Sequence, residues 1–259
     1  MFLEVSKLSQ VLWMAAALDV VTFARAFLEW TPNAAQEQVL RGLPNFRQAA
    51  LNCSRQWGKS TVAAVWVVHR LWFVPGATVL IVGPSQKQSG ETLRKVRYFL
   101  AVMGVKTKSD GLNRHSAVLP NGSRVVALPA NEVTARGFSA VSMLIVDEAS
   151  RVEDELFGAL MPCLATTNGD VMVMSTPKGK RGRFYEVMTE GERWLRHTGP
   201  VTECERIPVE FLVRERARGE SFYRQEYLCE FIENGTYLVD ERLVRVNKKG
   251  PHTRSCREE

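Results

Sequence analysis

The sequence lacks any long apolar run, and it is also poor in cysteine. No stretch of about 18 consecutive apolar residues occurs in its 259 positions, which excludes a multi-span membrane protein. The five cysteines stand at wide spacings, and no C-x-x-C pattern joins any two of them. An odd number of scattered cysteines argues against a disulfide framework and against a zinc site. We therefore expect a protein of a reducing compartment that needs no covalent or metal staple.

Extremes of composition are missing as well. Hydrophobic residues make up 45% of the chain and charged residues 24%, which is the balance of a globular protein with a sizeable core. Collagen-like, low-complexity and wholly disordered chains are thereby excluded, and the length suits one large domain or two small ones. The net charge of +6 is compatible with a nucleic-acid partner, but it fits a slightly basic enzyme equally well.

The N-terminal region has an apolar segment, residues 11–18, that could pass for the core of a signal peptide. Only one basic residue precedes it, however, and Asp19 follows it directly, so we predict an amphipathic helix over residues 8–28 instead. Residues 30–33 break this pattern, and a second helix is predicted over residues 34–42.

Apolar runs of strand length alternate with helical patterns along the next part of the chain. Such runs are typical of strands buried on both faces of a parallel sheet. Strands are predicted over residues 49–52, 77–82, 142–146 and 170–174, helices over 59–73, 89–103, 154–165 and 183–189, and a β-hairpin over 117–128. The alternation predicts a doubly wound α/β fold with a mainly parallel central sheet flanked by helices. One or two further helices, broken near Gly219, are predicted over residues 209–231.

The segment after the first of these strands carries a phosphate-binding pattern. Residues 53–60 read Cys-Ser-Arg-Gln-Trp-Gly-Lys-Ser and open a helix, which is the context of a P-loop. Backbone N–H groups of such a loop point at nucleotide phosphates, Lys59 would neutralise the β and γ oxygens, and the Ser60 hydroxyl would bind Mg²⁺. Cys53 replaces the usual first Gly, and a helix start with a solvent-facing lysine is the alternative. The predicted ATP-binding residues of the loop are Ser54, Arg55, Gln56, Trp57, Gly58, Lys59, Ser60 and Thr61.

Two carboxylates follow the buried strand over residues 142–146. Asp147 and Glu148 would lie at the carboxyl edge of the sheet, beside the P-loop. There Asp147 would hold Mg²⁺, and Glu148 would orient and polarise the attacking water. Two solvated acids at a strand end are the alternative.

A hydroxyl pair ends the strand over residues 170–174. Ser175 and Thr176, followed by Pro177, would contact the γ-phosphate or its water and report its loss. A Ser-Thr-Pro turn that simply closes a strand is the alternative, and taken alone this motif favours it.

In their order and spacing, these motifs resemble the ATPase domain of the large terminase subunit, the motor that packages DNA into tailed-phage and herpesvirus capsids. The residues that carry the resemblance are 17–24 with Thr31-Pro32 and Gln36, the P-loop variant 54–60, an Arg-Gly segment 134–138, the strand ends 144–149 and 174–179, and a closing segment 224–231. They cover most of the chain, and together they are far more specific than any one motif.

The resemblance implies roles for individual residues. Gln36 would recognise adenine, with an exposed helix residue as the alternative and Gln38 as its nearest rival. Arg55 and Arg136 would stabilise the γ-phosphate. Arg136 would act across a subunit interface in a ring, unless it is only a surface arginine before a Gly turn. The predicted catalytic set is Glu148, Arg55, Arg136 and Lys59.

The resemblance also implies a domain organisation. A P-loop NTPase domain would span residues 1–232, with an N-terminal helical segment up to about residue 45 and a small helical lid over about 200–232. Residues 175–177 would couple hydrolysis to movement of this lid, and residues 233–259 are interpreted as a basic tail or truncated linker. Large terminases usually carry a C-terminal nuclease with clustered acids. Here Asp240 and Glu241 cannot build a two-metal site alone, because each metal needs several carboxylates, so nuclease activity is not expected.

The implied activity is Mg-ATP hydrolysis that drives double-stranded viral DNA through a portal protein into a procapsid, in the host cytoplasm and away from membranes. The implied partners are double-stranded DNA, the portal, the small terminase subunit, further copies of the chain in a ring and, where the nuclease is separate, a nuclease chain. The basic loop over residues 178–183 either contacts DNA phosphates or is a solvated surface loop. A helicase-like ATPase and a non-catalytic nucleotide-binding module are the two alternatives. Strand separation without partners would support the first, and nucleotide binding without turnover the second.

Overall fold

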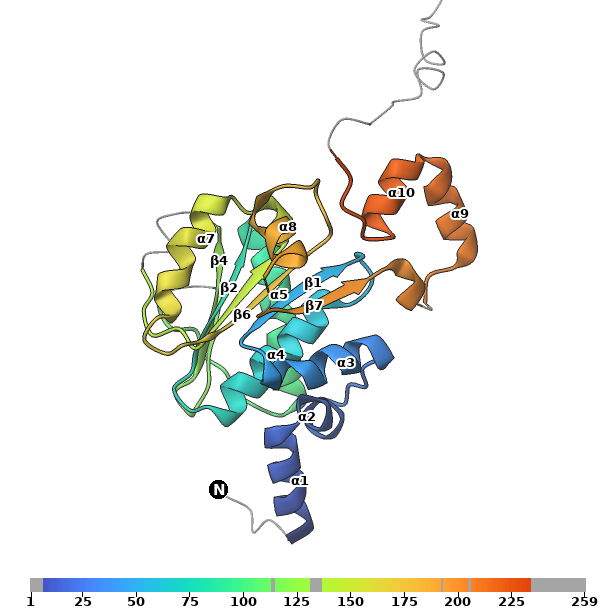
Figure 1. Ribbon diagram of the computed structural model, residues 1–259. Helices are drawn as coiled ribbons and strands as arrows, with labels where there is room; N and C mark the ends of the chain where they lie inside the picture. The colour runs from blue at the N-terminus through green and yellow to red at the C-terminus, as the bar shows by residue number, and fades with distance from the viewer. Residues whose placement is uncertain (1–6, 113–114, 131–136, 192, 205, 234–259) are drawn as a thin grey trace, which may run out of the picture.

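The computed structural model describes residues 7–112, 115–130, 137–191, 193–204 and 206–233. Within them the chain builds a seven-stranded sheet with the strand order β3-β4-β2-β5-β6-β1-β7 (Figure 1). The strands are β1 (Gln48–Cys53), β2 (Thr78–Gly83), β3 (Ser116–Val118), β4 (Arg124–Pro129), β5 (Met143–Asp147), β6 (Asp170–Ser175) and β7 (Leu195–Gly199). Neighbouring strands are parallel except β3 and β4, which confirms the predicted hairpin and the mainly parallel sheet.

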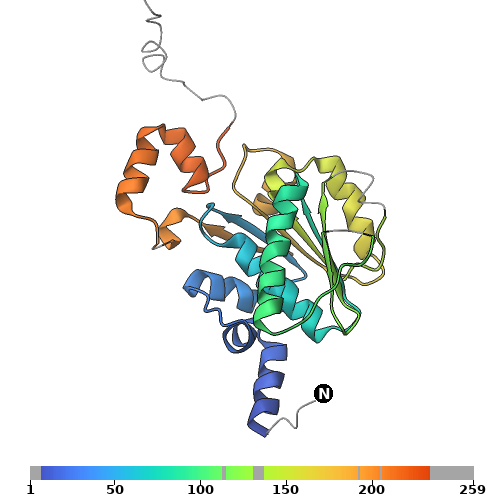
Figure 2. The same ribbon diagram turned by 180° about the vertical axis from the view of Figure 1, so that it is seen from behind.

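Helices cover both faces of the sheet (Figures 1 and 2). One face is covered by α4 (Lys59–Phe73) and α5 (Gln86–Val102), with α2 (Val20–Phe27) and α3 (Ala34–Gly42) beside them, and the other by α7 (Asp154–Leu160) and α8 (Gly182–Thr189). Strand side chains alternate between the two cores: Val79 and Ile81 join the first, whereas Leu80 and Val82 join the second. Both faces are therefore apolar, which is why these strands read as continuous apolar runs.

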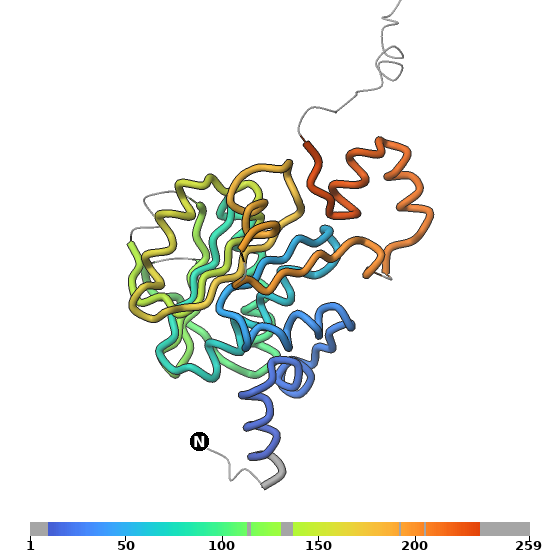
Figure 3. The backbone as a smooth tube through the Cα atoms, in the orientation of Figure 1, coloured from blue at the N-terminus to red at the C-terminus, as the bar shows by residue number. Residues whose placement is uncertain are grey.

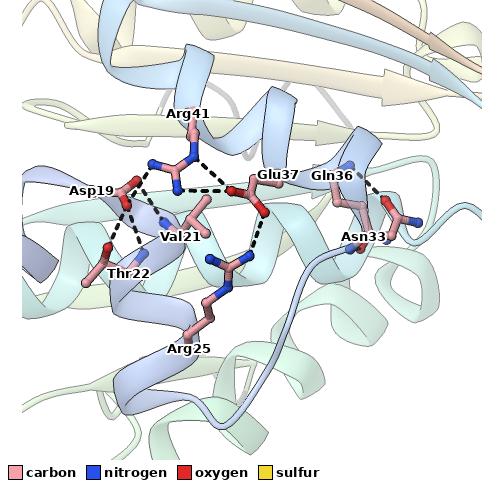
Figure 4. A network of polar contacts seen from close by, with 8 residues as sticks. All are labelled: Asp19, Val21, Thr22, Arg25, Asn33, Gln36, Glu37 and Arg41. Carbon is pink, nitrogen blue, oxygen red and sulfur yellow. Dashed lines mark hydrogen bonds and ion pairs between the residues drawn. The ribbon is translucent and has the colours of Figure 1, made fainter.

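The single helix predicted over residues 8–28 is wrong, because Asp19 divides it into α1 (Lys7–Leu18) and α2. The Asp19 carboxylate accepts hydrogen bonds from two backbone N–H groups in the first turn of α2, so it is the N-cap of that helix (Figure 4). Arg41 of α3 also binds this carboxylate, at 3.0 Å, and the cap thereby joins α2 to α3.

Other departures from the predictions concern the sheet and one helix. β7 was not predicted, because this edge strand is only half-buried and contains Arg196, His197 and Thr198. The sequence made no prediction of strand order, and the structure places β6 between β1 and β5. The helix predicted over residues 154–165 ends at Leu160 and continues as a short 3₁₀ turn, Met161–Leu164, in which proline stands near the start.

Residues 209–231, the helical part of the predicted lid, are called the lid below, and they lie beside the carboxyl ends of β1 and β7 (Figures 1 and 3). Its helices are α9 (Val209–Ala217) and α10 (Glu220–Glu226), so the break predicted near Gly219 is confirmed, although α10 ends before residue 231. After α10 the chain returns to the sheet. There the backbone N–H of Val201 donates to the carbonyl of Tyr227 at 2.7 Å, which ties the end of the lid to the strand region.

No helix among the described residues is long and apolar enough to cross a membrane. The tail predicted over residues 233–259, with Asp240 and Glu241, lies outside the described residues from position 234 onward. Arg136 of the Arg-Gly segment lies outside them as well.

Candidate active site

The P-loop connects β1 to α4 through a glycine with a left-handed backbone. Gly58 is the N-cap of α4 with φ +100°, a conformation that favours glycine. A Cβ at this position would also lie 2.7 Å from Nε2 of Gln36. A glycine at position 58 therefore permits both the turn into the helix and the close approach of Gln36.

Lys59 is buried, so the alternative of a solvent-facing lysine is wrong. Its ammonium donates hydrogen bonds to the carbonyl oxygens of Cys53 at 2.6 Å and of Ser54 at 3.0 Å. The positive charge of Lys59 thus lies next to backbone carbonyl groups of its own loop. Ser60 and Thr61 follow in the first turn of α4, where both are half-buried.

Trp57 fixes the P-loop to β7 and to the turn that follows β7. Its side chain is fully buried, its ring lies 5.1 Å from that of His197, and its Nε1 donates a hydrogen bond to Glu203 at 2.6 Å. Only the backbone of Trp57 is therefore left for a ligand. Cys53, at the position of the usual glycine, is also fully buried, and burial raises the pKa of its thiol, so it packs as a neutral apolar group.

Gln36 reaches the P-loop from α3. Its Nε2 donates to the carbonyl of Trp57 at 2.7 Å, and its Oε1 accepts from the backbone N–H of Asn33 at 3.0 Å (Figure 4). The side chain is buried, whereas the rival Gln38 is exposed. A cavity of about 510 Å³ opens beside this contact, and among the residues that line it are Trp30, Gln36, Gly58, Thr61, Glu203 and Arg206.

Asp147 ends β5 as a buried carboxylate. Thr92 of α5 donates its hydroxyl to Oδ2 at 2.7 Å, and the backbone N–H of Glu148 donates to Oδ1 at 2.9 Å. Burial raises the pKa of Asp147, and the hydrogen bond from Thr92 opposes that shift. Lys95 lies nearby and donates to the hydroxyl of Thr61 at 3.3 Å. The carboxylate is thus held in one orientation by the helix beside it.

Glu148 has a strained backbone. Its φ is +51°, which is rare for a residue other than glycine and is often found at functional sites. Its Oε2 is buried, and within the described residues no group donates a hydrogen bond to it. The nearest ion-pair partner is Nε of Arg151, 3.8 Å away. The alternative of two freely solvated acids does not describe this pair.

Two more buried oxygens lack a hydrogen-bond partner within the described chain, Oδ1 of Asn52 and Oγ1 of Thr176. Asn52 pairs with Ser175 across β1 and β6, and Asp147 pairs with Met174 across β5 and β6, so the register brings these oxygens and that of Glu148 to one edge of the sheet. A buried oxygen without a donor costs about 1–3 kcal/mol. Acceptors gathered beside a buried lysine suit a hydrated divalent cation and a phosphate-bound water.

The remaining predicted residues lie around this edge. Ser175 shares a 2.8 Å hydrogen bond with Ser150, and Pro177 is buried next to it. Arg55 is 68% exposed, and its Nε donates to Glu226 of the lid at 3.1 Å. Gln56 is exposed, and the buried hydroxyl of Ser54 lies 3.9 Å from the sulfur of Cys204. The described members of the predicted set therefore lie along the P-loop and at the carboxyl ends of β5 and β6, and Arg55 is directed toward the lid.

Sequence reasoning missed three polar residues that touch this set, Asn52, Thr92 and Glu226. Thr92 had one usable signal, because Ser89, Thr92 and Val96 share the buried face of α5, where a polar residue needs a partner. Asn52 is likewise a buried polar residue, which follows three buried apolar residues in β1. Nothing in the sequence around Glu226 points to Arg55, which is 171 positions away.

Comparisons with known proteins identify the family of this chain. The family model described as the N-terminal part of the terminase large subunit, T4likevirus-type, matches residues 50–240. The terminase large subunits of Thermus virus P23-45 and Thermus phage G20c are each 28% identical to the chain over 185 residues, which cover 64% of it. The chain spans about 38% of the length of these curated relatives.

Solved structures show the same fold. The ATPase domain of the Thermus phage P74-26 large terminase superposes with a TM-score of 0.71 at 20% identity, over 81% of this chain and 97% of that one. The bacteriophage HK97 large terminase gives 0.66 at 15%, over 83% and 55%. A thermophilic-phage large terminase in complex with ATP-γ-S gives 0.65 at 12%, over 77% and 52%. The fold is thus that of a P-loop ATPase domain, and the chain belongs to the large terminase subunit family.

Proposed function

We propose that this chain is the Mg-ATP-hydrolysing motor of a terminase that drives double-stranded viral DNA through a portal into a procapsid. The observation that carries the proposal is a set of three buried oxygens, on Asn52, Glu148 and Thr176, at the sheet edge beside the P-loop lysine. No group among the described residues forms a hydrogen bond with any of the three. Such an edge suits the hydrolysis of a phosphate anhydride, because it offers acceptors for a metal-bound and a reacting water.

The P-loop residues Ser54 to Thr61 bind the phosphates in this proposal. Lys59 turns its ammonium from the two loop carbonyls toward the β and γ oxygens, and the loop N–H groups point at the same oxygens. Ser60 and Asp147 hold Mg²⁺, the first through its hydroxyl and the second through a carboxylate that Thr92 keeps in place. The metal supplies positive charge that neutralises the phosphate oxygens.

Glu148 orients and polarises the attacking water in this proposal, since its Oε2, which has no donor among the described residues, can accept a hydrogen bond from that water. Arg55 and Arg136 stabilise the charge that develops on the γ-phosphate, Arg136 from a neighbouring subunit. Ser175, Thr176 and Pro177 transmit loss of the phosphate toward the lid. Asn52 supports such a route, because its Nδ2 donates to the carbonyl of Cys229 in the lid at 2.8 Å.

Gln36 recognises adenine in this proposal, since it lines the 510 Å³ cavity beside Gly58. A large terminase of similar fold has been solved with ADP.

The family supports the wider assignment. We propose an ATPase domain over residues 1–232 that acts in the host cytoplasm as a ring on the portal, with the small terminase subunit and a nuclease as further partners.

Phosphate release from ATP, measured over a wide range of protein concentration, tests the proposal. Turnover should rise faster than linearly with concentration, since Arg136 completes a neighbouring site, and it should vanish in Lys59→Ala. Lys87→Ala changes an exposed lysine in α5 and is the matched control, with unchanged turnover expected. Wild-type protein that releases no phosphate at any concentration, even with portal protein and DNA added, would contradict the proposal.

A further inference from the structure

Glu226 is a buried carboxylate whose described partner comes from the P-loop. Its side chain is 8% exposed, and Nε of Arg55 lies 3.1 Å from its Oε2. Arg55 itself is 68% exposed and makes no other hydrogen bond within the described residues. The burial is thus one-sided: the carboxylate depends on the guanidinium far more than the guanidinium depends on the carboxylate.

The ion pair spans the space between the P-loop and the lid. A cavity of about 680 Å³ lies there, and its lining includes Ser54, Arg55 and Gln56 on one side and Phe211, Phe222 and Glu226 on the other. Arg55 does not line the second cavity, beside Gly58 and Thr61, where Gln36 lies. Its side chain is therefore directed toward the lid.

We propose that Glu226 is a positioning residue that competes with nucleotide phosphates for Arg55. This inference rests on the proposed function, because it requires that the P-loop binds phosphates and that Arg55 contacts them. While Arg55 binds Glu226, its side chain points into the lid cavity. When its guanidinium binds a triphosphate instead, it therefore loses its bond to Glu226. Glu226 is then left as a buried charge without its partner.

A buried unpaired carboxylate is strongly unfavourable, so the lid adjusts until Glu226 reaches water or another cation. Arg218, on the wall of the same cavity, is such a cation, although Glu215 holds it at 2.9 Å. Phosphate binding and lid position are consequently coupled, and the coupling is reciprocal: whatever weakens the hold of Glu226 on Arg55 strengthens nucleotide binding.

Binding of a fluorescent ATP-γ-S analogue to the full chain tests this inference. Glu226→Gln keeps the size of the side chain but removes its charge. It should tighten binding by about threefold to tenfold, a modest factor because Arg55 is largely exposed. The double variant Arg55→Ala/Glu226→Gln should bind no tighter than Arg55→Ala alone. Glu210→Gln is the matched control, since Glu210 is an exposed acid of the neighbouring helix α9 that lines neither of the two cavities, and it should leave the affinity unchanged.

Hydrogen exchange of α10 gives a readout that does not depend on activity. ATP-γ-S should speed exchange over Glu220–Glu226 in the wild type, and in Glu226→Gln exchange should be fast with and without nucleotide. Unchanged or weaker binding by a folded Glu226→Gln, or tighter binding that persists without Arg55, overturns the inference while the proposed function stands. A wild type that binds no nucleotide overturns the proposed function and this inference together.

Discussion

Substitution of Gly199 by alanine should disturb the P-loop from a strand that carries no predicted site residue. Gly199 ends β7, pairs with Cys53 of β1, and accepts a hydrogen bond from the backbone N–H of Ser54 at 2.9 Å. A Cβ at this position would lie 2.5 Å from Cδ1 of Trp57 and 2.9 Å from the sulfur of Cys53. Both neighbours are fully buried, so neither can move aside without shifting the loop.

We expect Gly199→Ala to destabilise the fold by about 1–3 kcal/mol, the usual range for an overpacked core. If the loop shifts to relieve the clash, nucleotide binding weakens as well, by about tenfold for each 1.4 kcal/mol of binding free energy that is lost. Urea unfolding and ATP-γ-S binding measure the two effects. Trp57→Phe, which shortens the clashing ring system, should reduce the cost of the alanine in the double variant.

Gly158→Ala is the matched control. No atom of the described residues lies within 4 Å of a Cβ at Gly158 in α7, so the same change there should stabilise the helix by about 0.5–1 kcal/mol. Gly199→Ala with wild-type stability and affinity would refute the idea that β7 and Trp57 hold the P-loop in its conformation.

Three further predictions follow from named contacts. Asp19→Ala should cost about 0.5–2 kcal/mol near neutral pH. Burial raises the pKa of Asp19, but hydrogen bonds from Thr22 outweigh this and lower it, so its contribution is present above about pH 4 and lost as the pH falls through the folded-state pKa. Acid unfolding curves of wild type and variant should therefore converge, and parallel curves would contradict this. Thr92→Val should raise the Mg²⁺ concentration for half-maximal turnover by about tenfold, since Oδ2 of Asp147 loses its donor, whereas Thr92→Ser should restore it; an unchanged Mg²⁺ titration would count against this contact. Gln36→Ala should weaken binding of ATP but not of tripolyphosphate, and equal losses for both ligands would remove Gln36 from base recognition.

The elements that position the P-loop could be predicted from the sequence because their signals are local. Continuous apolar runs mark β2, β5 and β6, and α4 begins and ends at the predicted residues, Lys59 and Phe73. The position of Asp147 and Glu148 could also be predicted, because the carboxyl ends of parallel strands lie at one edge of the sheet.

The rest depends on contacts between distant segments. β7 has little apolar pattern, because it lies at the edge of the sheet and is only half-buried. Asp19 could be read as an exposed residue of one long helix, and only its contacts with the next turn and with Arg41 show that it caps a second one. Likewise Thr92 and Glu226 acquire their partners through packing of α5 and of the lid, which no spacing in the sequence records.

The central claim is that Glu148 activates water in a site that otherwise binds ATP through different residues. It is tested most directly by measuring ATP-γ-S affinity and ATP turnover side by side in Glu148→Ala, with Glu155→Ala, an exposed acid of α7, as the matched control. We predict that Glu148→Ala binds ATP-γ-S like the wild type but loses turnover by about 10²-fold or more, while the control keeps both. Turnover at the wild-type rate in Glu148→Ala would contradict the account.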